Sequence, residues 1–231
     1  GDTTINGPGA NLLTIDGNGD SSVFTTATGL SHAATISGLA ITGGSGSAIQ
    51  NTGNLNLLRD NIWGNTGTQG GAISNTSGGI LDIEFSAING NTATIGGGIY
   101  ATGRADIINS TIAGNSADQA GGIFSDDTLN IIDSTVAGNS ASNHGGIWSL
   151  GTLVLANSIV AGNGQGLNPD GTGALLPLGG YDLIGDGTGA TGATNGVNGY
   201  RIGTAGSPID PMLSALGNHG GPTPTTALLP G

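Results

Sequence analysis

Residues 97–120 read GGIYATGRADIINSTIAGNSADQA, and residues 121–144 read GGIFSDDTLNIIDSTVAGNSASNH. The two stretches align without a gap, so this part of the chain repeats every 24 residues. Self-similarity at a fixed period of roughly 20–50 residues is typical of solenoids and other repeat architectures. The apolar residue that follows the small pair recurs at Phe24, Ile49, Ile73, Ile99, Ile123 and Ile147. A Gly-Asn pair recurs with the same spacing and ends at Asn65, Asn91, Asn115, Asn139 and Asn163.

Each period contains short runs in which apolar and polar residues alternate, such as Leu81-Asp82-Ile83. This alternation predicts a strand with one buried face. A second strand is expected at the Ser-Thr-Ile element and a third at the Gly-Gly-Ile element, with turns rich in Gly, Asn, Asp and Ser between them. We therefore predict an all-β fold, a single right-handed parallel β-helix with three short strands in each coil of about 24 residues.

Proline sets the expected limits of the coils. A strand inside a sheet needs the backbone N–H that proline lacks, and the sequence has no proline between residues 9 and 168. The 24-residue period also ends after Asn163. We predict β-helix coils over residues 1–163, followed over residues 164–231 by a degenerate last coil and a C-terminal cap of the same domain. A cap is expected because the end of a β-helix is an unpaired sheet edge.

Composition excludes several classes of protein. The chain of 231 residues has 48 Gly, no Cys, three Lys plus Arg against fifteen Asp plus Glu, and a net charge of −12. Without cysteine there is no disulfide and no cysteine-ligated zinc. Such an acidic chain lacks the basic surface that a nucleic-acid partner requires. No apolar run is long enough for a transmembrane segment.

The repeats are similar to the coils of bacterial surface β-helix proteins. The order of the later segments resembles the choice-of-anchor Q domain of bacterial surface and secreted proteins; these segments are residues 157–163 (NSIVAGN), 180–186 (GYDLIGD), 208–213 (PIDPML) and 220–231 (GGPTPTTALLPG). The resemblance covers nearly the whole chain and implies a β-helix, export and no general catalytic residue. The chain departs from the family pattern where Gly171 and Thr226 replace a frequent Cys and His.

The resemblance and the composition together favour a non-enzymatic structural or adhesive module at the bacterial cell surface or in the extracellular space. Two alternatives remain open. The first is a module that binds or cleaves carbohydrate, in which case a polysaccharide lyase or a glycoside hydrolase is the expected enzyme. The second is a subunit of an extracellular filament that associates with further copies through the β-helix ends. The expected partners are accordingly glycans, other surface proteins or a second copy.

Two groups of oxygen-bearing side chains are candidate calcium sites. Asp82 and Asp106 are expected as outward neighbours about 4.8 Å apart on stacked coils, where a shared cation would relieve their repulsion. Such a carboxyl pair also has the spacing of a retaining glycosidase, about 5–5.5 Å, and a solvated strand face is the third interpretation. Asp16, Asn18 and Asp20 resemble the start of a calcium loop, although a tight turn needs the same residue types.

Two further columns follow from the period. Tyr100, Phe124 and Trp148 each follow the repeated Ile and are expected to form an outward aromatic row. Such a row either stacks sugar rings or stacks on itself. The asparagines of the Gly-Asn pairs are expected to form a structural ladder of side-chain hydrogen bonds between coils, through Asn65, Asn91, Asn115, Asn139 and Asn163.

Overall fold

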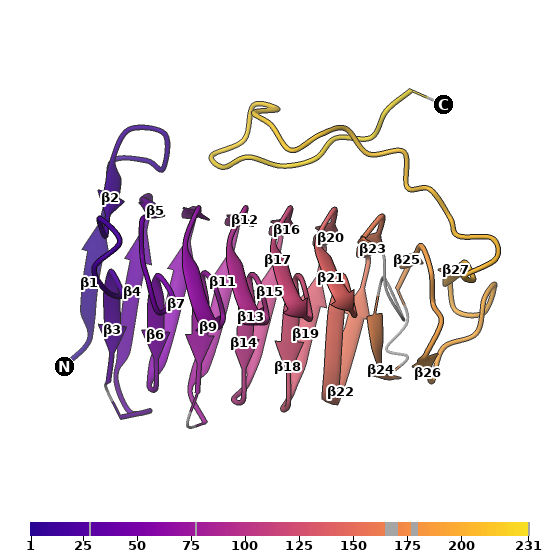
Figure 1. The fold of residues 1–231 in the computed structure, drawn as a ribbon, viewed down its shortest axis with the longest axis horizontal. Coiled ribbons are helices and arrows are strands. Elements are labelled where there is room, and N and C mark those ends of the chain that lie inside the picture. The colour runs from indigo at the N-terminus through magenta and orange to yellow at the C-terminus, as the bar shows by residue number, and fades with distance from the viewer. Residues whose placement is uncertain (28, 77, 165–170, 177–179, 231) are drawn as a thin grey trace.

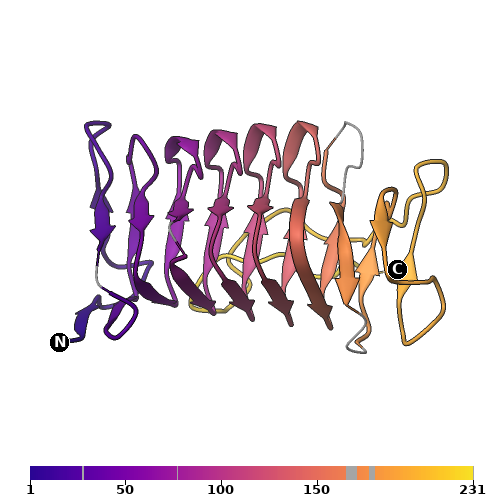
Figure 2. The ribbon, with the colours of Figure 1, turned by 90° about the horizontal axis from the view of Figure 1, so that it is seen from below.

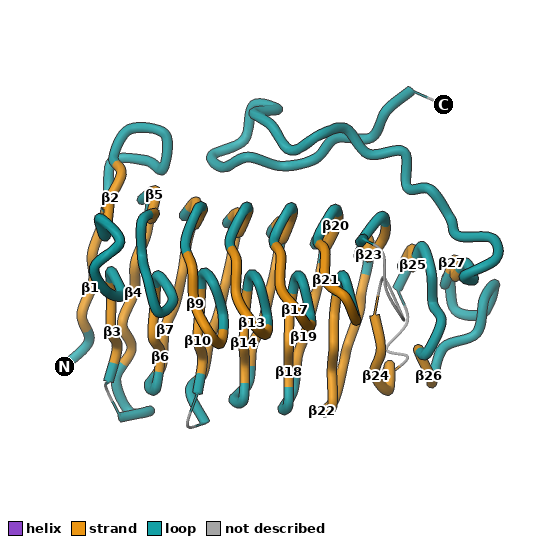
Figure 3. The backbone as a smooth tube through the Cα atoms, viewed as in Figure 1, coloured by secondary structure: helices purple, strands orange, loops and turns teal. Residues whose placement is uncertain are grey.

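The computed structural model describes residues 1–27, 29–76, 78–164, 171–176 and 180–230. Every regular element in these residues is a β-strand, and strands of successive coils pair in parallel. The coils stack along one axis (Figures 1 and 2), and only turns and loops connect the strands (Figure 3). The predicted parallel β-helix with a spacing of about 24 residues is therefore confirmed. The described residues include no helix that could span a membrane.

Face 1 of the coil contains the Gly-Gly-Ile elements. Its register places Ile99 on Ile123 and Ile123 on Ile147, and these three side chains are at most 1% exposed. The repeated isoleucines thus form the predicted inward column. The strands of face 1 are β3 (Phe24–Thr26), β6 (Ile49–Asn51), β10 (Ile73–Asn75), β14 (Ile99–Ala101), β18 (Ile123–Ser125) and the first part of β22 (Ile147–Ala156).

Face 2 contains the alternating runs, whose apolar residues point inward and whose polar residues point outward. In β11, Leu81 and Ile83 are fully buried while Asp82 between them is half-buried. Faces 1 and 2 join into one 14-stranded sheet because β22 extends through both and continues to β24 (Gly171–Leu176) and β26 (Ala190–Thr191). The other strands of face 2 are β1 (Thr3–Asn6), β4 (Ala33–Ser37), β7 (Asn54–Leu58), β11 (Ile80–Glu84), β15 (Ala105–Ile108) and β19 (Leu129–Ile132).

Face 3 is a nine-stranded sheet in which each three-residue strand turns its middle residue inward. Ile62, Ile88, Ile112 and Val136 fill these central positions and are fully buried. The strands are β2 (Thr14–Asp16), β5 (Ala40–Thr42), β8 (Asn61–Trp63), β12 (Ala87–Asn89), β16 (Thr111–Ala113), β20 (Thr135–Ala137), β23 (Ile159–Ala161), β25 (Leu183–Ile184) and β27 (Arg201–Ile202).

The central coils contain a fourth strand that the sequence analysis assigned to a turn. Apart from Ile95, these strands carry small and polar residues, and in β13 only Ala93 is buried. With one large apolar residue among the four strands, the alternation is too weak to predict a strand. They form face 4, a four-stranded sheet made of β9 (Thr66–Gln69), β13 (Thr92–Ile95), β17 (Ser116–Gln119) and β21 (Ser140–Asn143).

The last described residues return along the side of the coil stack. We call residues 205–230 the strap. It runs over face 3 from the C-terminal coils toward the N-terminal ones (Figure 1) and folds into a hairpin with antiparallel bridges between Leu213 and Leu228 and between Gly217 and Thr225. The strap thus covers a face of the β-helix along its length. Residues 165–170 and 177–179 of the predicted degenerate coil lie outside the described residues.

Candidate functional site

The outward column of face 2 places Asn56, Asp82, Asp106 and Asn130 next to one another in register. Arg104 forms an ion pair with Asp106 Oδ2, and Asn130 Nδ2 donates to Asp106 Oδ1 at 2.6 Å. Burial and the neighbouring Asp106 raise the pKa of Asp82. The described residues contain no group of three or more His, Cys, Asp or Glu side chains that could hold a metal. Arg104 therefore already compensates part of the charge, and calcium binding by this pair stays a prediction.

The segment of Asp16, Asn18 and Asp20 forms a tight turn at the end of β2. The backbone N–H of Asn18 donates to Asp16 Oδ1 at 2.8 Å, and Asn18 has a positive φ of 55°. All three side chains are exposed. Asp16 ends a strand of face 3, whereas Asp82 lies in face 2. The two candidate calcium groups therefore lie on different faces of the β-helix.

The aromatic row of face 1 stacks on itself. The rings of Tyr100 and Phe124 are 4.9 Å apart at an interplanar angle of 14°, and Trp148 meets Phe124 edge-on at 5.1 Å. His144, which the sequence analysis did not place here, stacks on Trp148 at 4.9 Å, and burial lowers its pKa. A sugar ring stacks on an exposed aromatic face. Neighbouring rings cover part of these faces, and sugar binding by the row stays a prediction.

The five asparagines of the Gly-Asn pairs form one buried column. Asn115 Oδ1 accepts hydrogen bonds from the backbone N–H and Nδ2 of Asn91, both within 3.0 Å. Asn115 Nδ2 in turn donates to Asn139 Oδ1 at 2.9 Å and to the Ile88 carbonyl oxygen at 3.0 Å. The same contacts recur between Asn65 and Asn91 and between Asn139 and Asn163. The column satisfies buried backbone groups at a corner, so its role in the fold is structural.

A second corner column, between faces 2 and 3, contains two aspartates that the sequence analysis missed. The backbone N–H of each residue donates to the side-chain oxygen of its neighbour in the next coil, at 2.8–3.2 Å. Asp60 Oδ1 also accepts from the Leu39 N–H at 2.9 Å. The spacing of about 24 residues from the serine row is the signal that identifies both aspartates. The column runs through Asp60, Ser86, Ser110, Ser134, Ser158 and Asp182.

The two aspartates of this column are ionisable groups in a buried setting. Burial raises the pKa of Asp60 to about 6, although the N–H groups of Leu39 and Leu58 oppose the shift. Burial also raises the pKa of Asp182. Asp182 Oδ2 and the Tyr200 hydroxyl are buried without a hydrogen-bond partner. These groups lie at a corner of the coil, and they do not line the hollows that the strap forms against face 3.

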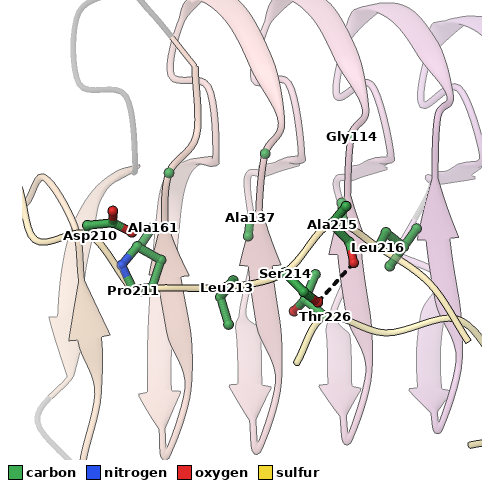
Figure 4. Close-up of a pocket in the computed structure, with 13 residues that line it drawn as sticks. Gly114, Ala137, Ala161, Asp210, Pro211, Leu213, Ser214, Ala215, Leu216 and Thr226 are labelled. Atoms are coloured by element: carbon green, nitrogen blue, oxygen red, sulfur yellow. Dashed lines mark hydrogen bonds between the residues drawn. The ribbon is translucent and has the colours of Figure 1, made fainter. Parts of the chain in front are cut away.

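The strap encloses hollows against face 3. One of them is a channel of about 340 Å³ between the strap and a row of Ala and Gly residues. In Figure 4, Pro211 lies beside Ala161, and Ser214 and Thr226 face the channel. Ser214 Oγ lies 3.1 Å from His219 Nε2, and it also bonds to the backbone of Ala215 and Ala227. No carboxylate of the described residues orients His219, so the pair lacks the third member of a hydrolytic triad.

Comparisons with known proteins identify no relative of this chain. No protein-family model, no curated protein and no solved structure matches this chain.

Proposed function

We propose that the protein is a non-enzymatic structural or adhesive module of an exported bacterial surface protein. The observation that carries the proposal is the continuity of its axial hydrogen bonds. The asparagine column joins five coils from Asn65 to Asn163 without a break. The serine and aspartate column joins six coils from Asp60 to Asp182. Such buried polar columns, hydrogen-bonded from coil to coil, favour a stiff rod over a deformable one.

The arrangement of reactive side chains supports the same proposal. The column serines donate their hydroxyls to backbone carbonyls, as Ser110 Oγ does to Ile108 at 2.8 Å. The carboxylates Asp82 and Asp106 lie on an open strand face, without a described pocket beside them. A net charge of −12 also disfavours an acidic polysaccharide substrate. A scaffold role accounts for these features without a reaction.

Three experiments test the proposal. Small-angle scattering of the purified chain is expected to fit a rigid rod, and antibodies raised against the chain are expected to label intact host cells. Incubation with neutral and acidic polysaccharides is expected to release no reducing ends and no unsaturated products. Turnover that disappears in the Asp82→Asn or Asp106→Asn variant would overturn the non-enzymatic proposal.

A further inference from the structure

Besides the channel, the strap forms a cleft of about 230 Å³ at its tip. Three separate parts of the chain meet there: the N-terminal loop with Asn11, strand β8 with Asn61, and the strap with Asn218. Pro222 and Pro224 complete the walls. None of the cleft residues carries a charge, although the chain as a whole is strongly acidic. Three amides that converge from distant segments form a polar, uncharged site.

Some hydrogen-bond donors and acceptors of the cleft amides are not used by the described residues. Asn61 Oδ1 accepts from Asn89 Nδ2 at 2.7 Å, which fixes the orientation of the Asn61 amide. Asn218 Oδ1 accepts from the Gly220 N–H at 2.9 Å. Among the described residues, neither Asn61 Nδ2 nor Asn218 Nδ2 makes a hydrogen bond, and the Asn11 side chain makes none either. The cleft therefore offers N–H donors from two amides and both a donor and an acceptor from Asn11.

An exposed indole lies next to the cleft. Trp63 is two residues after Asn61 in β8, so both side chains point outward on face 3, with Ile62 buried between them. Trp63 is 42% exposed, and its ring stacks on no other described aromatic ring. This separates Trp63 from the aromatic row of face 1, where the ring faces are occupied. An aromatic face beside several amides is suited to the apolar face and the hydroxyls of a sugar.

We propose that the cleft at the strap tip, with Trp63 beside it, binds a neutral glycan. The volume is below the ~300 Å³ typical of the smallest drug-sized pockets, which suits one sugar ring or the end of a chain. The overall negative charge disfavours an acidic glycan. An adjoining hollow of about 250 Å³ shares Asn11 and Pro222 and provides room for a second ring near Arg59. This inference rests on the adhesive function proposed above and names the class of ligand that the module would bind.

The site also explains a role for the strap. Asn218 and both prolines belong to the strap, whereas Asn11 and Asn61 belong to the coils. Thr223 Oγ1 donates to the Phe85 carbonyl oxygen at 3.1 Å and holds the strap tip on the turn between β11 and β12. The binding site is complete only while the strap lies on face 3. Weakening this contact is therefore expected to weaken glycan binding without breaking the β-helix.

Titration calorimetry with neutral hexasaccharides tests the site. The panel contains hexamers of glucose, mannose, xylose, galactose and N-acetylglucosamine. Saturable binding of at least one hexamer is expected, with at least a tenfold loss of affinity in Asn61→Ala and in Trp63→Ala. The control variant Gln69→Ala removes an exposed amide from face 4, and Trp148→Ala removes a ring of the aromatic row. Both controls are expected to bind as the unchanged protein does.

A fluorescence titration avoids the risk that a cleft variant misfolds. The chain has two tryptophans, so Trp63 is the sole indole reporter in the Trp148→Phe variant. Its emission is expected to change saturably with the hexamer that binds in calorimetry. The proposal is overturned if no neutral hexamer binds at 10 mM, if only polygalacturonate or a peptide binds, or if binding depends on Trp148 and not on Asn61. The scattering experiment on the rod is independent of all these outcomes.

Discussion

At the scale of single residues, the corner between faces 2 and 3 shows how one side chain changes the chemistry of a repeated position. Four coils use serine there, whose hydroxyl accepts from one backbone N–H and donates to a carbonyl, as in Ser86. Asp60 occupies the same position with a carboxylate that accepts two N–H bonds. The carboxylate is fully buried, so its charge carries a desolvation cost that a hydroxyl avoids.

This difference predicts how stability depends on pH. The pKa of Asp60 is raised from 3.8 to about 6 in the folded state, so the folded protein binds the proton more tightly than the unfolded chain does. The contribution of Asp60 is therefore fully present well below pH 4 and is lost as the pH rises through 6, by about 3 kcal/mol in total. In Asp60→Ser, we expect the fall in unfolding free energy between pH 3 and pH 8 to shrink by about this amount. Chemical denaturation at each pH measures it.

The matched control is Asp118→Ser, which removes an exposed carboxylate from β17. Its unfolding free energy is expected to follow the pH profile of the unchanged protein. An Asp60→Ser profile as steep as that of the Asp118→Ser control would contradict the assignment of this pH dependence to Asp60.

Phe85 occupies the turn position just before this column and has an unfavourable backbone conformation. Its φ is 50°, and the corresponding residues Asn109, Asp133 and Asn157 have φ values of 48–53°. The left-handed region costs an ordinary residue about 1–2 kcal/mol, whereas Asn tolerates it well. The Arg59 guanidinium lies 5.4 Å from the Phe85 ring centre, and an exposed pair of this kind contributes only about 0.5–1 kcal/mol.

Replacing Phe85 by Asn therefore gains more from relieving the backbone strain than it loses with the cation–π contact. Phe85→Asn is expected to raise the unfolding free energy by up to about 1 kcal/mol, measured by thermal or denaturant unfolding. Arg59→Ala serves as the comparison because it removes the cation–π contact and leaves Phe85 in place. A lower stability of Phe85→Asn than of Arg59→Ala would show that the ring contact outweighs the strain.

At the scale of one element, the asparagine column links sheets that share no backbone hydrogen bond. Each buried amide bonds to the asparagine of the next coil and to a backbone carbonyl of the preceding coil. An unsatisfied buried polar group costs about 1–3 kcal/mol. Truncating one member leaves groups of both neighbouring coils without a partner. The middle of the column is therefore the position where a single substitution has the widest effect.

Asn115→Ala is expected to lower the unfolding free energy by about 3–5 kcal/mol. The backbone N–H of Asn91 loses its acceptor, and the side-chain hydrogen bonds of Asn115 with Asn91 Nδ2, the Ile88 carbonyl oxygen and Asn139 Oδ1 are lost. Asn130→Ala is the control, since it removes an amide from the outward column of face 2, which is in contact with solvent. The control is expected to cost less than about 1 kcal/mol. Equal losses in the two variants would contradict a special role for the buried column.

At the scale of the whole molecule, the coils and the strap are held in different ways. A coil is paired on both sides by parallel strands, and its apolar side chains lie in one continuous core. The strap bonds to the central coils through Thr223 to Phe85 and through the hydroxyls of Thr111 and Thr225, 3.0 Å apart. Few buried contacts imply a low free energy of local opening.

Native-state hydrogen exchange is expected to reveal this difference directly. The amides of the strap should exchange well before those of Ile99 and Ile123 in the inward column. Thr223→Val removes the bond to the Phe85 carbonyl, so it is expected to accelerate exchange in the strap and leave the coil amides unchanged. Strap amides that are as protected as the Ile123 amide would contradict this two-level stability.

The amino-acid pattern was sufficient to predict the coil. Each coil contacts only its neighbours, so the 24-residue period and the alternation within it translate directly into register, inward columns and corner ladders. The stacking of Ile99 on Ile123 and the neighbouring positions of Asp82 and Asp106 were therefore predictable. Face 4 was not, because its strands carry small and polar residues apart from Ile95, and their alternation is too weak to distinguish a strand from a turn.

The features that lie outside the repeat could be seen only in the folded protein. The path of the strap, the meeting of Asn11, Asn61 and Asn218 and the stacking of His144 on Trp148 depend on segments with no periodic relation. The aromatic row was predicted as a column, but only the ring angles distinguished self-stacking from an open platform. The physical reason is common to all of these features. In a repeat, the spatial neighbours of a residue lie one period away in the sequence. Contacts between non-repeating segments depend instead on how the whole chain packs.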